Sequence, residues 1–236
     1  MGLFDLFKKS KNDTNGWETV LSKNLGKMLV IQHNAWEYVK DRDWWLEFRG
    51  GYIYFGDEKL PMQFIGSEYA GDNTWMWGWH NINQLPERLI RIAQQTQALG
   101  LKHNIKQLNT KKFCITDEVN GHNLSIVACG CAEENLFYHR CTNGETSVFV
   151  AVENAPKELF QPVDPARFVS TVTQAIAEYT IDHKLFAESF LDWNKTPYTW
   201  EGDTLIAHFP QKVCLDFETT QKQHYVIRHI RSETQE

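Results

Sequence analysis

The sequence lacks the short motifs that mark the best-known catalytic and cofactor-binding folds. None of the patterns HExxH, CxxC, GxSxG, GxGxxG or Walker A occurs in its 236 residues. These absences argue against the metalloproteases, zinc ribbons, hydrolases and nucleotide-binding folds that carry them. Whether the protein is an enzyme is left open, but a protein without catalytic activity is favoured, and no cofactor is predicted.

Membrane-spanning and secretory signals are also missing. No apolar run approaches the roughly 18 residues that cross a bilayer, and no charged-then-apolar leader opens the chain. The five cysteines are odd in number and irregularly spaced, which does not fit a disulfide framework. We therefore expect a cytoplasmic protein with reduced thiols.

A basic surface is lacking as well, because the formal net charge is -6. Nucleic-acid binding needs a basic stripe that displaces phosphate counterions, so no nucleic-acid partner is predicted. An acidic chain suits a basic protein partner. Solubility alone also explains this charge.

Residues 1–14 are predicted to form a flexible or amphipathic N-terminal segment ahead of the fold. Apolar residues at its start are followed by three lysines, and this pattern could touch an anionic membrane: Leu3, Phe4, Leu6, Phe7, Lys8, Lys9 and Lys11. The segment is too short to anchor the protein, and Leu6 stands where a myristoylation signal requires Ser or Thr. Membrane contact by residues 1–11 is therefore not expected.

Hydrophobic periodicity predicts the elements of the fold. Helical spacing covers 17–40, and period-two alternation over 44–80 predicts four antiparallel strands. The next helix is expected to begin near Leu85, with Pro86 in its first turn, and to stop at Gly100. In the middle segment 101–159 we expect a short strand at FCIT, a helix at HNLSIVACGCAEE and a hairpin turning at Asn143-Gly144.

The last part of the chain repeats this order of elements. Asp164 and Pro165 predict the start of one long helix reaching about Trp193, and four short strands follow over 197–230. The chain is thus expected to be a single α+β domain, 15–236, with antiparallel sheets and long helices packed on one face. Two similar helix-plus-four-strand halves, 15–100 and 160–236, are a further hypothesis.

The stretch TWMWGWHN, residues 74–81, is the most distinctive in the chain. In an extended strand Trp75, Trp77 and Trp79 point to one face. Such rows stack on sugars or bases in some proteins, but the acidic charge and the apolar neighbouring strand favour a row in which at least two rings lie in the core. His80 is a weak ligand-binding candidate, and Asn81 or Asn83 is interpreted as the cap of the next helix.

The run SEY-AGDN-TWMWGWHN resembles a bacterial family of uncharacterised proteins, a domain of unknown function marked by a TW-x-W-x-W-x-N signature. The similarity extends to SIVACGCA, FYHR and VFVAV further along the chain. Trp75, Trp77, Trp79 and Asn81 match the signature. The family carries a small residue at the position of His80, which lowers any catalytic claim for that histidine, and it implies no activity.

One group of residues has the composition of a metal site: His122, Cys129, Cys131, His139 and Cys141. Four of them would have to converge on a zinc ion. If their segment is helical, Cys129 and Cys131 point apart, whereas in a strand they share a face. Because free cysteines are commonly small buried hydrophobes, no metal is predicted.

The leading hypothesis is a non-enzymatic, cytosolic bacterial module that binds another protein. A toxin-neutralising immunity protein that docks on a basic toxin is one such role. The alternative is a small-molecule-binding or enzymatic domain with an aromatic-lined pocket, in which His80, Tyr138 and His139 supply polar groups.

Overall fold

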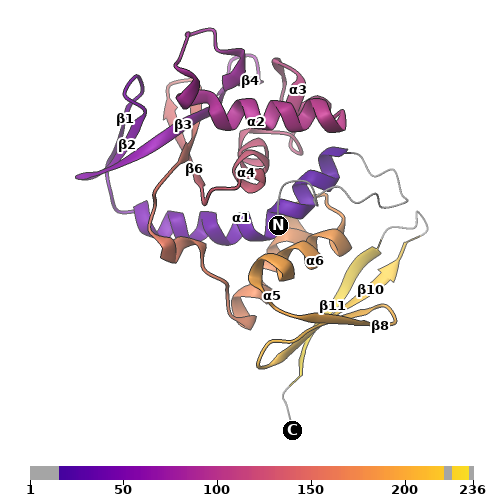
Figure 1. Cartoon of the computed structure of the whole chain (residues 1–236). Helices are drawn as coiled ribbons and strands as arrows, with labels where there is room; N and C mark the ends of the chain where they lie inside the picture. Colours follow the sequence, from indigo (N-terminus) through magenta and orange to yellow (C-terminus); the bar gives the residue numbers. More distant parts are fainter. Residues whose placement is uncertain (1–15, 221–224, 234–236) are drawn as a thin grey trace. The chain divides into compact units, whose positions relative to one another are not determined.

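The computed structural model describes residues 16–220 and 225–233 and shows an α+β protein (Figure 1). The described residues form two compact units. The first contains 16–17 and Ile31–Leu159, and the second contains Glu18–Val30 and 160–233 without 221–224. Helix α1 (Gly16–Val39) therefore contributes residues to both units.

The first unit is built on a seven-stranded antiparallel sheet. Its strands are β1 (Trp44–Glu47), β2 (Tyr52–Phe55), β3 (Glu58–Tyr69), β4 (Thr74–Trp77), β5 (Lys112–Cys114), β6 (Phe137–Asn143) and β7 (Thr146–Val152). Strands β1 to β5 lie in chain order, and β7 pairs with both β3 and β6. The predicted four-strand meander and the hairpin at Asn143-Gly144 are both confirmed.

Helices α2 (Glu87–His103) and α4 (Gly121–Cys131) pack on the same face of this sheet. A β-bulge between Phe64 and Gly66 brings Gln63 and Glu68 onto one face of β3. Gln63 Oε1 accepts from the Ile92 amide of α2 at 2.8 Å, and Glu68 accepts from the Gly121 amide of α4. The expectation of an α+β fold with helices on one face of an antiparallel sheet is thus confirmed.

Helix α2 does not stop at Gly100, as the sequence predicted. It continues to His103, and Asn104 ends it in the left-handed conformation with φ of 52°. A β-carbon on Gly100 would lie 2.6 Å from Leu108 Cβ. Gly100 therefore allows the short helix α3 (Lys106–Asn109) to pack against α2, while the asparagine provides the stop.

The second unit contains α5 (Pro165–Glu178), α6 (His183–Asn194) and a four-stranded sheet. Its strands are β8 (Tyr198–Glu201), β9 (Thr204–Ala207), β10 (Lys212–Thr219) and β11 (Tyr225–Glu233), in the order β11-β10-β9-β8. The four predicted strands are confirmed, and Asp164 caps α5 by accepting from the Arg167 amide at 2.8 Å.

The single long helix predicted for 165–193 is wrong, because it is divided into α5 and α6. Tyr179 is extended, and Asp182 caps α6 by accepting from the Leu185 amide at 2.9 Å. The Asp182 amide donates to Ser22 Oγ of α1 at 2.9 Å, so a partner distant in sequence takes the place of a helical bond. Since β1 to β4 belong to a seven-stranded sheet and β8 to β11 to a four-stranded one, the hypothesis of two duplicated halves is not confirmed.

None of the helices in the described part of the chain is both long and apolar enough to cross a membrane. The hypothesis on membrane contact by residues 1–11, and the N-terminal segment 1–14 as a whole, lie outside the described residues.

Candidate functional site

The tryptophan row is divided between a strand and a turn. Trp75 and Trp77 lie in β4, are 0% and 1% exposed, and meet edge to face with ring centroids 5.3 Å apart. Strand β4 ends at Trp77, and Trp79 lies half-buried in a 3-10 turn, η2 (Gly78–His80). The predicted single face of three rings is therefore wrong for Trp79, whereas the core interpretation is confirmed for the other two.

A close backbone contact explains why the chain turns after Trp77. A β-carbon on Gly78 would lie 2.8 Å from the Phe64 carbonyl oxygen, so only glycine allows β3 to approach this closely. The Trp77 indole N–H donates to the Gln107 carbonyl at 2.9 Å, which ties the strand to α3. The buried Trp75 indole N–H has no partner among the described residues.

Asn81 closes the loop after the turn and is not the cap of α2. Its φ is 45°, and its side chain pairs with both backbone groups of Leu85, accepting at 2.7 Å and donating at 2.9 Å. Pro86 occupies the N-cap position of α2 without a side-chain bond. Asn81 is therefore a structural residue, because it closes a bend that needs the left-handed conformation.

The three ligand-binding candidates do not form one site in the described contacts. Tyr138 and His139 are neighbours on β6, so their side chains point to opposite faces of the sheet. The Tyr138 hydroxyl lies 3.2 Å from His122 Nδ1, whereas the His139 ring packs edge-on against Trp44 and Phe55. No contact among the described residues joins His80 to either of them.

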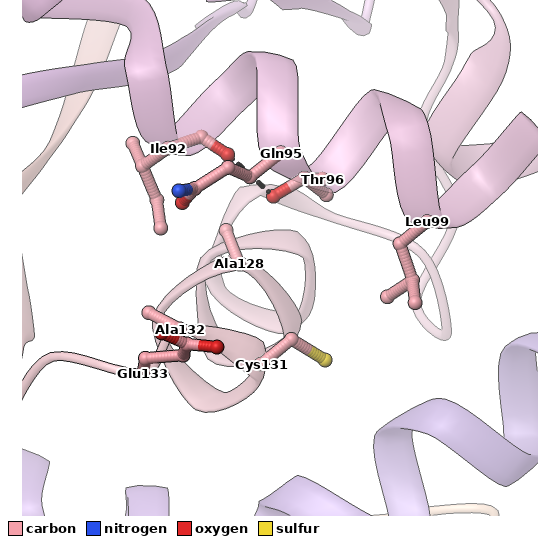
Figure 2. Close-up of a pocket in the computed structure, with 8 residues that line it drawn as sticks. All are labelled: Ile92, Gln95, Thr96, Leu99, Ala128, Cys131, Ala132 and Glu133. Atoms are coloured by element: carbon pink, nitrogen blue, oxygen red, sulfur yellow. Dashed lines mark hydrogen bonds between the residues drawn. The ribbon is translucent and has the colours of Figure 1, made fainter. Parts of the chain in front are cut away.

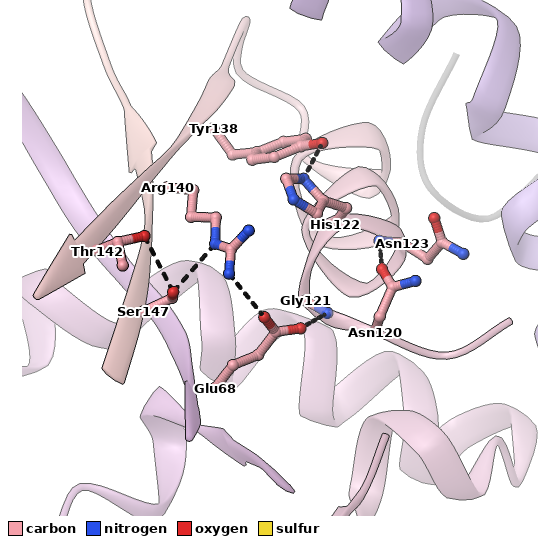
Figure 3. Close-up of polar contacts among 9 residues, drawn as sticks. All are labelled: Glu68, Asn120, Gly121, His122, Asn123, Tyr138, Arg140, Thr142 and Ser147. Carbon is pink, nitrogen blue, oxygen red and sulfur yellow. Dashed lines mark hydrogen bonds and ion pairs between the residues drawn. The ribbon is translucent and has the colours of Figure 1, made fainter. Parts of the chain in front are cut away.

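A polar cluster that includes Glu68, His122 and Arg140 lies on the face that carries α4 (Figure 3). The His122 ring and the Arg140 guanidinium both pack on Phe149. Glu68 accepts from the first amide of α4 and lies 3.8 Å from the Arg140 guanidinium. Arg140 Nε also donates to Ser147 Oγ at 3.0 Å. The Glu68 side chain is 12% exposed, so this carboxylate compensates the positive end of α4 and fixes the helix on the sheet.

The surroundings of His122 and His139 favour the neutral form of both imidazoles. Burial lowers the pKa of His139 to about 4. The pKa of His122 is lowered by desolvation and then by Arg140, against an opposing effect of Glu68. Neither ring is hydrogen-bonded to a carboxylate in the contacts of the described residues, so the base and orienting acid of a catalytic pair are not assembled.

The cysteines and histidines considered for zinc do not converge on one point. His122, Cys129 and Cys131 lie in α4, whereas His139 and Cys141 lie in β6. Cys129 and Cys131 lie in α4, so they point to different sides of it, and Cys129 is buried. Over 16–220 and 225–233, no three His, Cys, Asp or Glu side chains are grouped in a way that could hold a metal ion.

The outer hairpin of the first sheet presents an exposed aromatic surface. We call Trp44, Trp45 and Tyr54 the aromatic edge; Trp44 and Trp45 are neighbours on β1, so their rings lie on opposite faces of the hairpin, and Trp45 shares its face with Tyr54. Trp44 and Trp45 are 39% and 50% exposed, and the Trp45 ring stacks on Tyr54 with centroids 3.6 Å apart. Glu47 accepts a hydrogen bond from the Tyr54 hydroxyl at 3.0 Å and forms an ion pair with Lys59 at 3.2 Å. These contacts fix the position of the Tyr54 ring on which Trp45 stacks.

The surroundings of the aromatic edge are acidic. Three of the four bases between residues 36 and 59 are neutralised by carboxylates: Lys40 by Glu37, Arg42 by Glu58 and Lys59 by Glu47. The fourth base is Arg49. Asp41, Asp43 and Asp57 are exposed and form no ion pair within the described residues. A net negative charge therefore lies on the hairpin that carries Trp44 on one face and Trp45 on the other.

A hollow between α2 and α4 is the second candidate site (Figure 2). It encloses about 170 Å³ and is lined by Ile92, Gln95, Thr96, Leu99, Ala128, Cys131, Ala132 and Glu133. No aromatic residue is among these, and the volume is below the roughly 300–1,000 Å³ of typical ligand pockets. This hollow is thus not the aromatic-lined pocket of the alternative hypothesis.

Sequence reasoning missed Glu68 and Arg140, although one signal for Glu68 was present. Glu68 lies directly opposite Trp75 in the β3–β4 register, so it occupies a position that faces the core. A charge at such a position calls for a partner. Arg140 comes from a strand distant in sequence, and no local pattern indicates it.

Comparison with known proteins defines the class of the chain. A model of a family of unknown function, DUF6882, matches residues 20–155, which is more than half of the chain and includes TWMWGWHN. The chain belongs to this family. Neither the curated proteins nor the solved structures give a match.

Proposed function

We propose that this protein is a non-enzymatic protein-binding module of the bacterial cytoplasm that holds a basic segment of its partner on the aromatic edge. The observation that carries the proposal is Trp45, 50% exposed on an outermost strand and stacked on Tyr54, with Trp44, 39% exposed, on the other face of the same strand. Tryptophan is enriched at the centres of protein interfaces because its large ring is buried there at low entropic cost.

Preorganisation supports this role for the edge. Trp45 is already stacked on Tyr54, whose hydroxyl is bonded to Glu47. A partner that covers the ring therefore has little side-chain freedom to remove, and this reduces the cost of binding.

Charge supports the choice of a basic partner. The exposed carboxylates Asp41, Asp43 and Asp57 stand beside the edge and would accelerate encounter with a positively charged surface. A basic toxin, held in an inactive complex, is a partner of this kind. In that case the protein acts as an immunity protein, which requires occlusion and no chemistry.

The test is capture of a partner from the native host, followed by direct measurement with the purified partner. We expect a recurrent protein of net positive charge whose affinity falls as salt rises. Trp45→Ala should weaken binding by about tenfold or more. Leu101→Ser is the matched control, because Leu101 is a 65% exposed apolar residue on α2, outside the edge.

The proposal fails if no protein recurs, or if Trp45→Ala and Leu101→Ser bind equally well. For the immunity role, the captured protein should arrest growth when expressed alone. Coexpression with this protein should restore growth, and coexpression with the Trp45→Ala variant should not.

A further inference from the structure

We propose that the hollow between α2 and α4 binds a small primary amine that carries a short apolar or aromatic tail. This inference concerns a different surface and does not rest on the proposed function. Figure 2 shows side chains of the two helices facing one another around the hollow.

The walls select the size and the apolar part of the ligand. Ile92, Leu99 and Ala128 are buried, and Ala132, the residue that follows α4, completes the apolar lining. The hollow is partly open to solvent, and its volume of about 170 Å³ is close to that of the apolar cavities, about 150 Å³, that hold one benzene ring. A single ring or a chain of a few carbons therefore fits.

Thr96 and Glu133 select a head that donates hydrogen bonds, and the Gln95 amide can accept such a bond as well as donate one. Thr96 Oγ1 gives its hydrogen to the Ile92 carbonyl at 2.8 Å, so its oxygen can only accept from a ligand. An ionised Glu133 carboxylate also only accepts. An ammonium group has three donors and a positive charge, so it can pair with Glu133 or donate to Thr96 Oγ1, whereas a carboxylate ligand would be repelled by Glu133.

Glu133 is available for this role and the neighbouring Glu134 is not. Glu134 pairs with Arg91 of α2 at 2.9 Å, and Arg91 is held in addition by Glu153 at 3.0 Å. Glu133 lines the hollow and forms no ion pair in the part of the chain that the structure describes. The two adjacent glutamates thus provide a site residue and its matched control.

The experiment is a titration of the full ¹⁵N-labelled chain with benzylamine, benzyl alcohol and benzoate, followed by amide chemical shifts. Benzylamine should shift amides of 92–99 and 128–133. Benzyl alcohol, which has the same ring without the charge, should bind about fivefold more weakly, and benzoate should cause no shifts there. Glu133→Gln should weaken benzylamine binding by a similar factor, and Glu134→Gln should leave it unchanged.

A filling variant tests the position of the ligand. Ala132→Leu introduces a larger side chain at a half-buried wall position, and it should abolish the benzylamine shifts while the rest of the spectrum stays folded. Absence of shifts at millimolar benzylamine overturns the proposal, as do equal effects of benzoate, full affinity in Glu133→Gln, or full affinity in a folded Ala132→Leu.

Discussion

Gln32 and Tyr138 are joined by a matched pair of hydrogen bonds. Gln32 Nε2 donates to the Tyr138 carbonyl, and the Tyr138 amide donates to Gln32 Oε1, each at 2.9 Å. Among the strands of the described residues, β6 pairs only with β7. The side-chain amide of α1 therefore takes the place of a peptide group from a further strand, and it protects an open edge of the sheet.

Replacing Gln32 with leucine should lower the free energy of unfolding of the first unit by about 1–3 kcal/mol, because two backbone groups lose their partners. Hydrogen exchange of the Tyr138 amide measures the effect at the site. Gln94→Leu, an exposed glutamine of α2, is the control and should change stability by less than about 0.5 kcal/mol. Equal stability of the two variants would contradict this account of the edge.

The two buried tryptophans of β4 should respond differently to phenylalanine. Trp77→Phe leaves the Gln107 carbonyl without its donor, whereas Trp75→Phe removes an N–H that has no partner within the described part of the chain. Both variants lose ring volume, so the difference between them isolates the hydrogen bond. We expect Trp77→Phe to cost about 1 kcal/mol more, measured by urea unfolding followed by circular dichroism.

His139 should make the stability of the first unit depend on pH. Its pKa falls from 6.5 in the unfolded chain to about 4 in the fold because of burial. The unfolded state thus binds more protons between these values, and stability is complete above pH 6.5 and is lost as the pH falls toward 4. His139→Phe should reduce this loss, since a neutral ring can pack against Trp44 and Phe55.

The control for this titration is His229→Gln, an exposed histidine of the second unit. It should leave the pH dependence of the first unit unchanged. Hydrogen exchange of β6 and β7 amides at pH 7 and pH 5 separates this unit from the other. An identical loss of stability in wild type and His139→Phe would show that other groups control the acid response.

Gly26 provides a prediction in which packing and helix propensity have opposite signs. Alanine is favoured over glycine by about 1 kcal/mol inside a helix, but a β-carbon here would lie 2.5 Å from the Phe190 ring. Overpacking costs about 1–3 kcal/mol, so we expect Gly26→Ala to destabilise the second unit. Thermal unfolding of Gly26→Ala/Phe190→Leu should recover part of the loss, and a stabilised single variant would refute the close contact.

Local patterns in the sequence were sufficient for most elements of the fold. Alternation located the strands of both sheets. Asn143-Gly144 marked a hairpin and Asp164-Pro165 marked the start of a helix, because the backbone preferences of these residues act within a few positions of the chain. These features depend on neighbours along the chain, which a sequence displays directly.

The errors came from partners that are distant in sequence. The break between α5 and α6 is supported by Ser22, and the turn after Trp77 follows the close approach of Phe64. Likewise, Glu68 and Arg140 meet only when β3 and β6 lie in one sheet. Most of the candidate sites could therefore not be predicted, since none of these contacts leaves a periodic signal.

The division of α1 between the units affects the order in which the chain can fold during synthesis. Residues Glu18–Val30 belong to the second unit together with the segment that begins at Phe160. During synthesis this helical segment leaves the ribosome before any strand of the first unit's sheet. The part of the chain with which it is grouped, from Phe160 onward, leaves the ribosome last. The apolar residues of the helical segment, Leu25 and Met28 among them, must wait for the last third of the chain, so the interval before that third emerges is when a nascent chain depends most on chaperones.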